Sequence, residues 1–198
     1  MSAQLQTISG ILFLLFGGLA FFDGVYLHLW RFRLFAWRES RREHALHTVR
    51  AILYPLTIYL MLAIEARGFW LYVGVFVALI DLIFQGWDLF EERKARRGFG
   101  GLSAFEYALH VWLTGIHMAA LTAAICARSV ADWTLHASIT STNPALSPLG
   151  IEIAWFLLPG AIVVAILHAA LLHPFFVKGD APPASMFRSR EPGLMPLF

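Results

Sequence analysis

The chain has 198 residues and a mass of 22.2 kDa; 59% of its residues are hydrophobic and 14% are charged, with a mean hydropathy of +0.66. Because an average soluble domain is about 25% charged, this composition leaves too few polar residues to cover a water-facing surface. It excludes a soluble enzyme, a disordered regulator and a secreted disulfide scaffold, and the single cysteine, Cys126, also excludes an internal disulfide bond. A net charge of +2 is too small to suggest a nucleic-acid partner. The composition therefore predicts a multi-spanning membrane protein.

Five apolar stretches are long enough to cross a bilayer, which takes about 20 residues of helix. They cover roughly residues 8–31, 47–66, 69–90, 107–127 and 150–173. Backbone polar groups in lipid must be satisfied within the chain, so we predict an all-α integral membrane protein with five transmembrane helices. The N-terminus lacks the features of a cleaved signal peptide, so the first stretch is expected to stay as a span. We expect one five-helix domain over residues 1–176 and a Pro-rich, disordered cytoplasmic tail over 177–198.

Basic residues gather on one side of the predicted spans. They lie between the first and second spans (Arg31, Arg33, Arg38, Arg41, Arg42), between the third and fourth (Arg93, Lys94, Arg96, Arg97) and in the tail (Lys178, Arg188, Arg190). The opposite side carries only Arg67 and Arg128. The positive-inside rule then places the N-terminus outside and the C-terminus in the cytoplasm, and we expect a bacterial inner membrane.

An internal repeat follows this topology. Residues 40–47 read SRREHALH and residues 103–110 read SAFEYALH, which share the pattern S-x-x-E-x-A-L-H. Upstream, Asp23 is matched by Asp81, 58 residues later. We therefore predict a tandem helical-hairpin repeat, about 8–66 and 67–127, that forms a four-helix bundle to which the fifth helix is added. The S-x-x-E element is also a capping box, which is a purely structural explanation for Glu43 and Glu106.

Carboxylates inside the spans are the main functional signal. Asp23 and Asp81 lie within apolar helices, where an ionisable group is costly and needs a partner. Reflecting each hairpin about its loop brings Asp23 level with His47 and Asp81 level with His110. His28, five residues after Asp23, is expected to point away from this face.

The same helix faces carry further polar residues at helical spacing. They form three stripes: Glu43, His47 and Arg50; Asp81, Gln85 and Asp88; and Glu106, His110, Thr114 and His117. Five acids then meet Arg50 as the single embedded base, and uncompensated buried charge is too costly to persist. The acids must be protonated, paired or bound to cations.

Carboxylates and histidines on facing helices are typical of di-iron sites in helical bundles, so we predict a metal site near the cytoplasmic face. Its candidate ligands are Asp23, Glu43, His47, Asp81, Glu106 and His110, with Asp88 and His117 as second-rank candidates. Arg50 would orient an anionic headgroup or balance the acids. Iron is the expected metal, with manganese or zinc as alternatives. Haem held by paired histidines and a purely structural set of Asp–His hydrogen bonds stay open as well.

This site leads to two functional hypotheses. The first is a membrane oxidoreductase of the hydroxylase or desaturase type that acts on a lipid, a hydrocarbon or a quinone. Integral-membrane desaturases offer a comparison of chemistry only, because the chain has no H-x-x-H-H box and only His44 and His47 show part of that spacing. The second is an accessory subunit of a larger membrane complex, or a carrier of metal ions or protons, in which the Asp–His layer is structural.

Overall fold

The computed structural model describes residues 2–64, 66–137 and 147–180, and within these ranges the chain is helical with short connections and no strand. The long α-helices are α1 (Ser2–Phe21), α2 (Arg41–Ile58), α3 (Phe69–Ala95), α4 (Ala104–Cys126) and α5 (Pro148–Leu171). Two of them continue as π-helices, α1 into η1 (Phe22–Arg31) and α2 into η3 (Tyr59–Ala63). Short 3-10 helices are η2 (Leu34–Ala36), η4 (Arg96–Phe99), η5 (Val130–Trp133) and η6 (Pro174–Phe176). Most of the expected disordered tail, 181–198, lies outside the described residues.

Five helical segments are long and apolar enough to cross a membrane, which agrees with the prediction of an all-helical chain with five such helices and suggests a multi-pass membrane protein. They are Ser2–Arg31, Arg41–Ala63, Phe69–Phe99, Ala104–Cys126 and Pro148–Leu171. The predicted second and third spans were too short at their charged ends, because the helical segments there continue through residues of which some charged ones, such as Glu43, Glu92 and Arg96, are buried. Pro55 and Pro159 both lie inside continuous helices.

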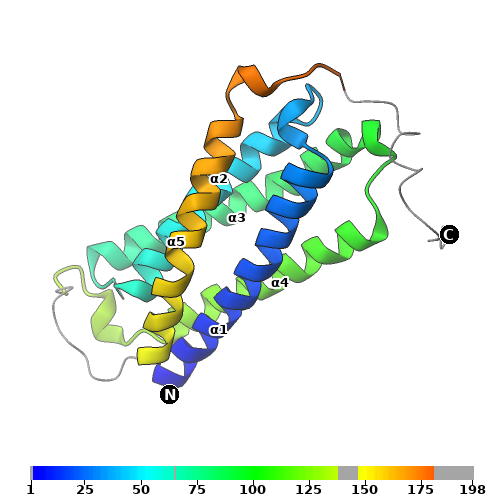
Figure 1. The fold of residues 1–198 in the computed structure, drawn as a ribbon. Helices are drawn as coiled ribbons and strands as arrows, with labels where there is room; N and C mark the ends of the chain where they lie inside the picture. The colour runs from blue at the N-terminus through cyan, green and yellow to red at the C-terminus, as the bar shows by residue number, and fades with distance from the viewer. Residues whose placement is uncertain (1, 65, 138–146, 181–198) are drawn as a thin grey trace.

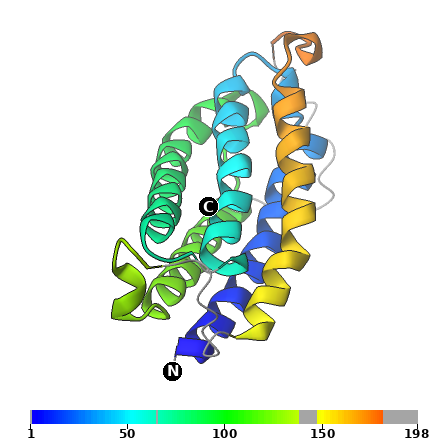
Figure 2. The same ribbon diagram turned by 90° about the vertical axis from the view of Figure 1, so that its left-hand side faces the viewer.

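The helices pack in an order that differs from their order in the chain. Helix α1 packs along α4, α2 packs along α3, and α5 contacts both α1 and α2. Figures 1 and 2 show α5 beside α1, with the α1–α2 connection, the α3–α4 connection and the end of α5 toward the same end of the bundle. Near the other end α1 and α5 approach closely, since a Cβ added to Gly10 would lie 3.1 Å from the Cα of Gly150.

The distribution of side chains is that of a protein in lipid. Large apolar residues such as Phe90, Trp112 and Phe156 are 75%, 67% and 76% exposed on the outer surface. Acids, histidines and an arginine are buried between the helices. One half of the interior holds an apolar core around Phe13, Ile58, Leu62, Ala120 and Leu158. The polar residues that carry the candidate site occupy the other half.

The two matching octapeptides differ at their caps. Ser103 and Glu106 form the predicted capping box at the start of α4, in which the Ser103 hydroxyl accepts from the Glu106 N–H. The prediction is wrong for Ser40, whose hydroxyl donates to the Leu34 carbonyl at 2.6 Å and makes no cap. Glu43 therefore takes no part in a capping box, and its carboxylate contacts Arg96 instead.

Candidate metal centre

The π-helix η1 decides where the first two site residues lie. In a π-helix the backbone hydrogen bonds join residues five apart, and the Phe32 N–H donates to the Leu27 carbonyl at 2.9 Å in this way. Asp23 and His28, also five apart, therefore lie on one face, with His28 Nε2 3.4 Å from Asp23 Oδ1. The expectation that His28 points away is wrong, because it assumed α-helical geometry.

Four helices converge on His28. One group consists of Asp23, His28 and His47, and a second of His28, Glu92 and His110; within each, one potential ligand atom per residue lies within 4.8 Å of the others. All five residues are buried. They come from η1, α2, α3 and α4, so the packing of α1 on α4 and of α2 on α3 assembles the centre.

The separations between donor atoms suit a bound cation. His110 Nε2 lies 3.2 Å from Asp23 Oδ1, and His110 Nδ1 lies 2.9 Å from Glu92 Oε2. Two ligand atoms bound about 2.1 Å from one ion at right angles lie about 3.0 Å apart. A neutral imidazole has only one N–H, so His110 cannot donate to both carboxylates without an added proton or cation.

Buried polar atoms at the centre lack ordinary partners. Within the part of the chain that the structure describes, neither ring nitrogen of His28 has a hydrogen-bond partner, and the ring is 1% exposed. Glu92 Oε1 and Asp88 Oδ1 are likewise buried without one among these residues. Buried polar groups are nearly always satisfied, and a bound water molecule or a metal ion would satisfy these atoms.

Beside this centre, Arg96 holds together the two repeated glutamates. Its guanidinium lies 3.2 Å from Glu43 and 2.9 Å from Glu106, and it stacks over the Phe32 ring at 4.5 Å. The residue is fully buried. The expectation that Arg50 is the only embedded base is wrong, because Arg96 was assigned to the basic loop. Glu43 and Glu106 are consequently ion-paired, although Glu43 Oε1 also lies 3.9 Å from His28 Nε2.

A second polar group extends from the centre toward the middle of the bundle. Arg50 lies 3.3 Å from Asp81 and 3.6 Å from Asp88, and Asp88 lies 3.0 Å from His47. His117 lies 3.6 Å from Asp81 and also contacts Gln85. Asp23 and His47 do come together as predicted, whereas Asp81 meets Arg50 and His117 instead of the predicted His110. Asp88, Glu43 and Glu106 are all buried.

The charges at this end of the bundle do not balance within the described residues. Apart from Glu91, which pairs with Lys94, six carboxylates are buried there against two guanidinium groups, which leaves a formal charge of −4 when all six are ionised and the histidines are neutral. The carboxylates are Asp23, Glu43, Asp81, Asp88, Glu92 and Glu106. Two divalent cations would bring the formal charge to zero.

The sequence interpretation missed three residues of this region: Glu92, Arg96 and His168. Glu92 continues the α3 stripe of Asp81 and Asp88 at helical spacing, so the pattern could have been extended to it. His168, on α5, stacks against His44 with ring centroids 5.3 Å apart. Neither Glu92 nor His168 belongs to a sequence motif.

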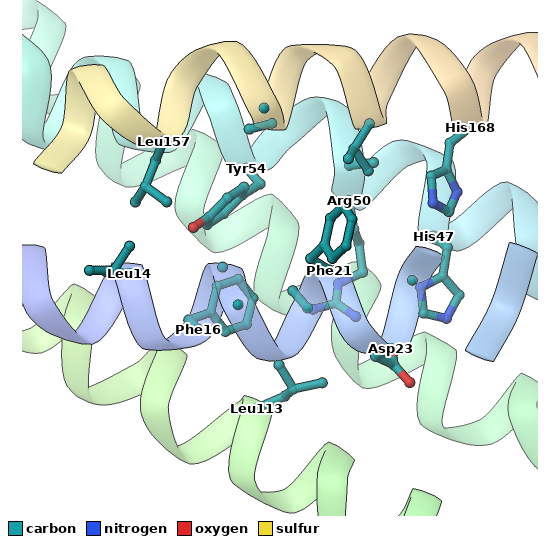
Figure 3. Close-up of a pocket in the computed structure, with 18 of the residues that line it drawn as sticks. Leu14, Phe16, Phe21, Asp23, His47, Arg50, Tyr54, Leu113, Leu157 and His168 are labelled. Carbon is teal, nitrogen blue, oxygen red and sulfur yellow. The ribbon is translucent and has the colours of Figure 1, made fainter. Parts of the chain in front are cut away.

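A cavity of about 380 Å³ leads to the centre from the apolar side of the bundle. It lies between α1, α2 and α5, and Figure 3 shows Asp23, His47 and His168 at one end with Leu14 and Leu157 at the other. The candidate centre therefore has an apolar approach. No family model, curated protein or solved structure matches this chain, so its chemistry rests on the residues themselves.

Proposed function

We propose that this chain is a membrane metalloprotein whose buried Asp/Glu/His centre binds two transition-metal ions, with oxidoreductase activity on an apolar substrate. The observation that carries the proposal is His28, a buried imidazole that belongs to both potential ligand groups and whose two ring nitrogens have no hydrogen-bond partner among the described residues. The proposed ligands are Asp23, His28, His47, Glu92 and His110. Asp88 is a further candidate through its contact with His47.

Carboxylate and imidazole ligands favour iron or manganese, and zinc is a less suitable alternative. A pair of iron ions held by these residues would supply oxidation by dioxygen. In the balanced reaction, a substrate C–H bond, O₂, two electrons from a reduced donor and two protons give an alcohol and water. A lipid, a hydrocarbon and a quinone are the proposed substrate classes.

The residues around the centre have separate roles in this proposal. Asp23 and His47 face the cavity, so they would stand between the centre and a substrate. Arg50 balances Asp81 and Asp88. Arg96 pairs with both Glu43 and Glu106, which supports their assignment as structural acids and not as ligands.

The alternative function as a carrier of protons or metal ions receives less support. A carrier needs a polar route to both faces of the membrane, but the apolar core around Phe13, Ile58 and Leu62 fills the other half of the described interior. The buried polar groups can thus be reached from one end of the helical bundle and from the cavity. A closed centre of this kind suits chemistry on a bound substrate better than transport.

We also propose that the hairpins are a true repeat in a bacterial inner membrane, with the N-terminus outside and the C-terminus in the cytoplasm. Two features support the repeat. Glu43 and Glu106 occupy equivalent octapeptide positions and share Arg96. A twofold axis between the hairpins would map α1 onto α3 and α2 onto α4. It would therefore turn the packed pair α1–α4 into the packed pair α2–α3, as a repeat requires. The basic residues at the end that holds the centre support the orientation.

Elemental analysis of the purified protein tests the metal centre. After loading with Fe(II), Mn(II) or Zn(II), we expect about two ions per chain, falling below about 0.3 in His28→Ala because both groups lose a ligand. His117→Gln is a matched control, since His117 is buried but belongs to neither group. It should keep the wild-type metal content.

Two outcomes would overturn the proposal. One is wild-type protein that holds fewer than about 0.3 ions per chain with all three metals. The other is a metal content that His28→Ala leaves unchanged, when size-exclusion chromatography shows the variant to be folded. A Soret band in the absorption spectrum would show bound haem and would contradict the proposed Asp/Glu/His metal centre.

A further inference from the structure

The cavity beside the centre is lined mainly by α1 with η1, α2 and α5, and Asp81 of α3 and Leu113 of α4 complete its wall. On α5 the lining residues are Leu157, Ala161, Val164 and His168, spaced i, i+4, i+7 and i+11. On α2 they are His47, Arg50, Ala51 and Tyr54, and on α1 they run from Leu14 through Gly17 to Gly24. The cavity is thus a property of the helix packing and not of a loop.

Its mouth opens on the apolar outer surface. Phe21 on α1 and Phe156 on α5 line the cavity and are 57% and 76% exposed. The lining also includes Gly18 and Gly160, which have no side chain to fill the opening. A Cβ added at either glycine would meet no atom within 4 Å. Since the surrounding surface is that of apolar spans, this opening would face the acyl chains of a bilayer and not water.

Its inner end is the centre itself. Asp23 and His47 both line the cavity and both belong to the first ligand group. Any molecule that fills the cavity therefore has one part next to these two side chains. In Figure 3 the apolar wall leads along Phe16 and Tyr54 toward Asp23 and His47.

The walls favour an alkyl chain over a polar ring. Tyr54 Oη already donates to the Phe13 carbonyl at 3.0 Å, and Arg50 Nε donates to Asp81 at 3.3 Å. These two groups are therefore engaged within the chain, and Figure 3 shows the other labelled polar side chains, Asp23, His47 and His168, at the inner end, with Leu14 and Leu157 at the other. The part of the cavity away from the centre thus suits an alkyl chain better than a quinone ring, whose carbonyl groups need hydrogen-bond donors. Taking roughly the 30 Å³ that a water molecule occupies in the liquid for each methylene-sized group, the cavity of 380 Å³ holds about 12 of them.

We propose that this cavity binds an unbranched alkyl chain, which enters from the bilayer between α1 and α5 and places a carbon atom beside Asp23 and His47. An alkyl chain is thus the substrate class that we assign to the proposed metal centre. The chemistry at the inner end of the cavity rests on that proposed function. The chain could belong to a free long-chain hydrocarbon or alcohol, or to a membrane lipid. Both share the same recognition chemistry.

Photolabelling in lipid nanodiscs tests this binding. One arm uses a dodecanol that carries a diazirine near its methyl end, and the other uses a phosphatidylcholine with the same diazirine on one acyl chain. We expect saturable labelling of peptides from α1 and α5 that contain cavity residues. Labelling by the free chain alone assigns a free substrate, labelling by the phospholipid assigns a lipid, and both support the alkyl site.

Ala161→Phe is the blocking variant, because Ala161 lies in the middle of the α5 stripe that faces the cavity. We expect it to lower saturable labelling at least about tenfold with unchanged metal content. Val163→Phe is its matched control: Val163 is two residues away, 63% exposed and outside the cavity lining. It should label like the wild type.

The outcomes separate this proposal from the metal centre. Labelling that persists in His28→Ala supports the cavity even if the metal proposal fails, because His28 does not line the cavity. A metal-loaded protein without saturable labelling of α1 and α5 in either arm would overturn the alkyl site while the centre stands. Equal labelling of Ala161→Phe and wild type would overturn it as well.

Discussion

Arg96 is the residue whose replacement should change the stability of the bundle most. It is fully buried, it pairs with Glu43 at 3.2 Å and with Glu106 at 2.9 Å, and it stacks over Phe32. Arg96→Met keeps a long side chain in the same space but leaves two buried carboxylates without their cation. Removing one partner of a buried ion pair costs about 3–5 kcal/mol, because the remaining charge is uncompensated.

This magnitude is measurable by thermal unfolding in detergent micelles. At about 2–4 °C per kcal/mol for a chain of this size, Arg96→Met should lower the unfolding midpoint by about 6–20 °C. Arg97→Met is the matched control, since Arg97 is the next residue and is exposed. Its effect should stay within about 0.5 kcal/mol.

A second variant distinguishes lost charge pairing from lost packing. Glu43→Gln with Glu106→Gln in the Arg96→Met background replaces the unpaired carboxylates by neutral groups of the same shape. We expect it to recover a large part of the lost midpoint, because a neutral amide costs less to bury than an unpaired carboxylate. If Arg96→Met shifts the midpoint no more than Arg97→Met, the claim that Arg96 compensates these acids is refuted.

Three further measurements follow from the same structure. Removing bound metal with a chelator should lower the unfolding midpoint, since a ligand at 100 times its Kd stabilises by about 2.7 kcal/mol, and the chelator should have no effect on His28→Ala. Gly10→Val should destabilise by about 1–3 kcal/mol, because its Cβ would meet the Gly150 backbone at 3.1 Å, whereas Gly86→Ala, with no atom within 4 Å of its Cβ, should be neutral or stabilising in the same assay. Ser103→Ala should cost about 1 kcal/mol through the lost N-cap of α4, and no loss in thermal unfolding would contradict the capping box.

The five helices were predictable because each is a long apolar segment, and lipid permits few other structures for such a segment. Asp23, His47 and His110 were predictable for a related reason, since a polar residue in an apolar helix needs a polar neighbour. Reflection of the hairpins brought Asp23 correctly to His47. It failed for Asp81, because the distance along a helix does not determine the direction in which a side chain points around the helix axis. In the structure Asp81 contacts Arg50 of α2.

Glu92 and Arg96 show where composition misleads. Both lie beside a cluster of basic residues that ordinarily marks the membrane surface, so the predicted span ended at residue 90. In the structure the helical segment continues to Phe99, and the spacing of Asp81, Asp88 and Glu92 continues on one face. Periodicity was the better guide here, because it follows the surface that packs, whereas hydropathy follows only the average around the helix.

His28 depends on a feature that the local sequence does not reveal. At 100° per residue, an α-helix would rotate His28 about 140° away from Asp23, out of reach of the other ligands. The π-helix over Phe22–Arg31 removes this offset and lets one chain segment contribute two adjacent ligands. π-helices are rare, and the single-turn π-bulges in which they mostly occur are frequently found at functional sites. Here the π-helix lies where the cavity meets the centre, so the same unusual backbone sets both the ligand geometry and the inner wall that a substrate would touch.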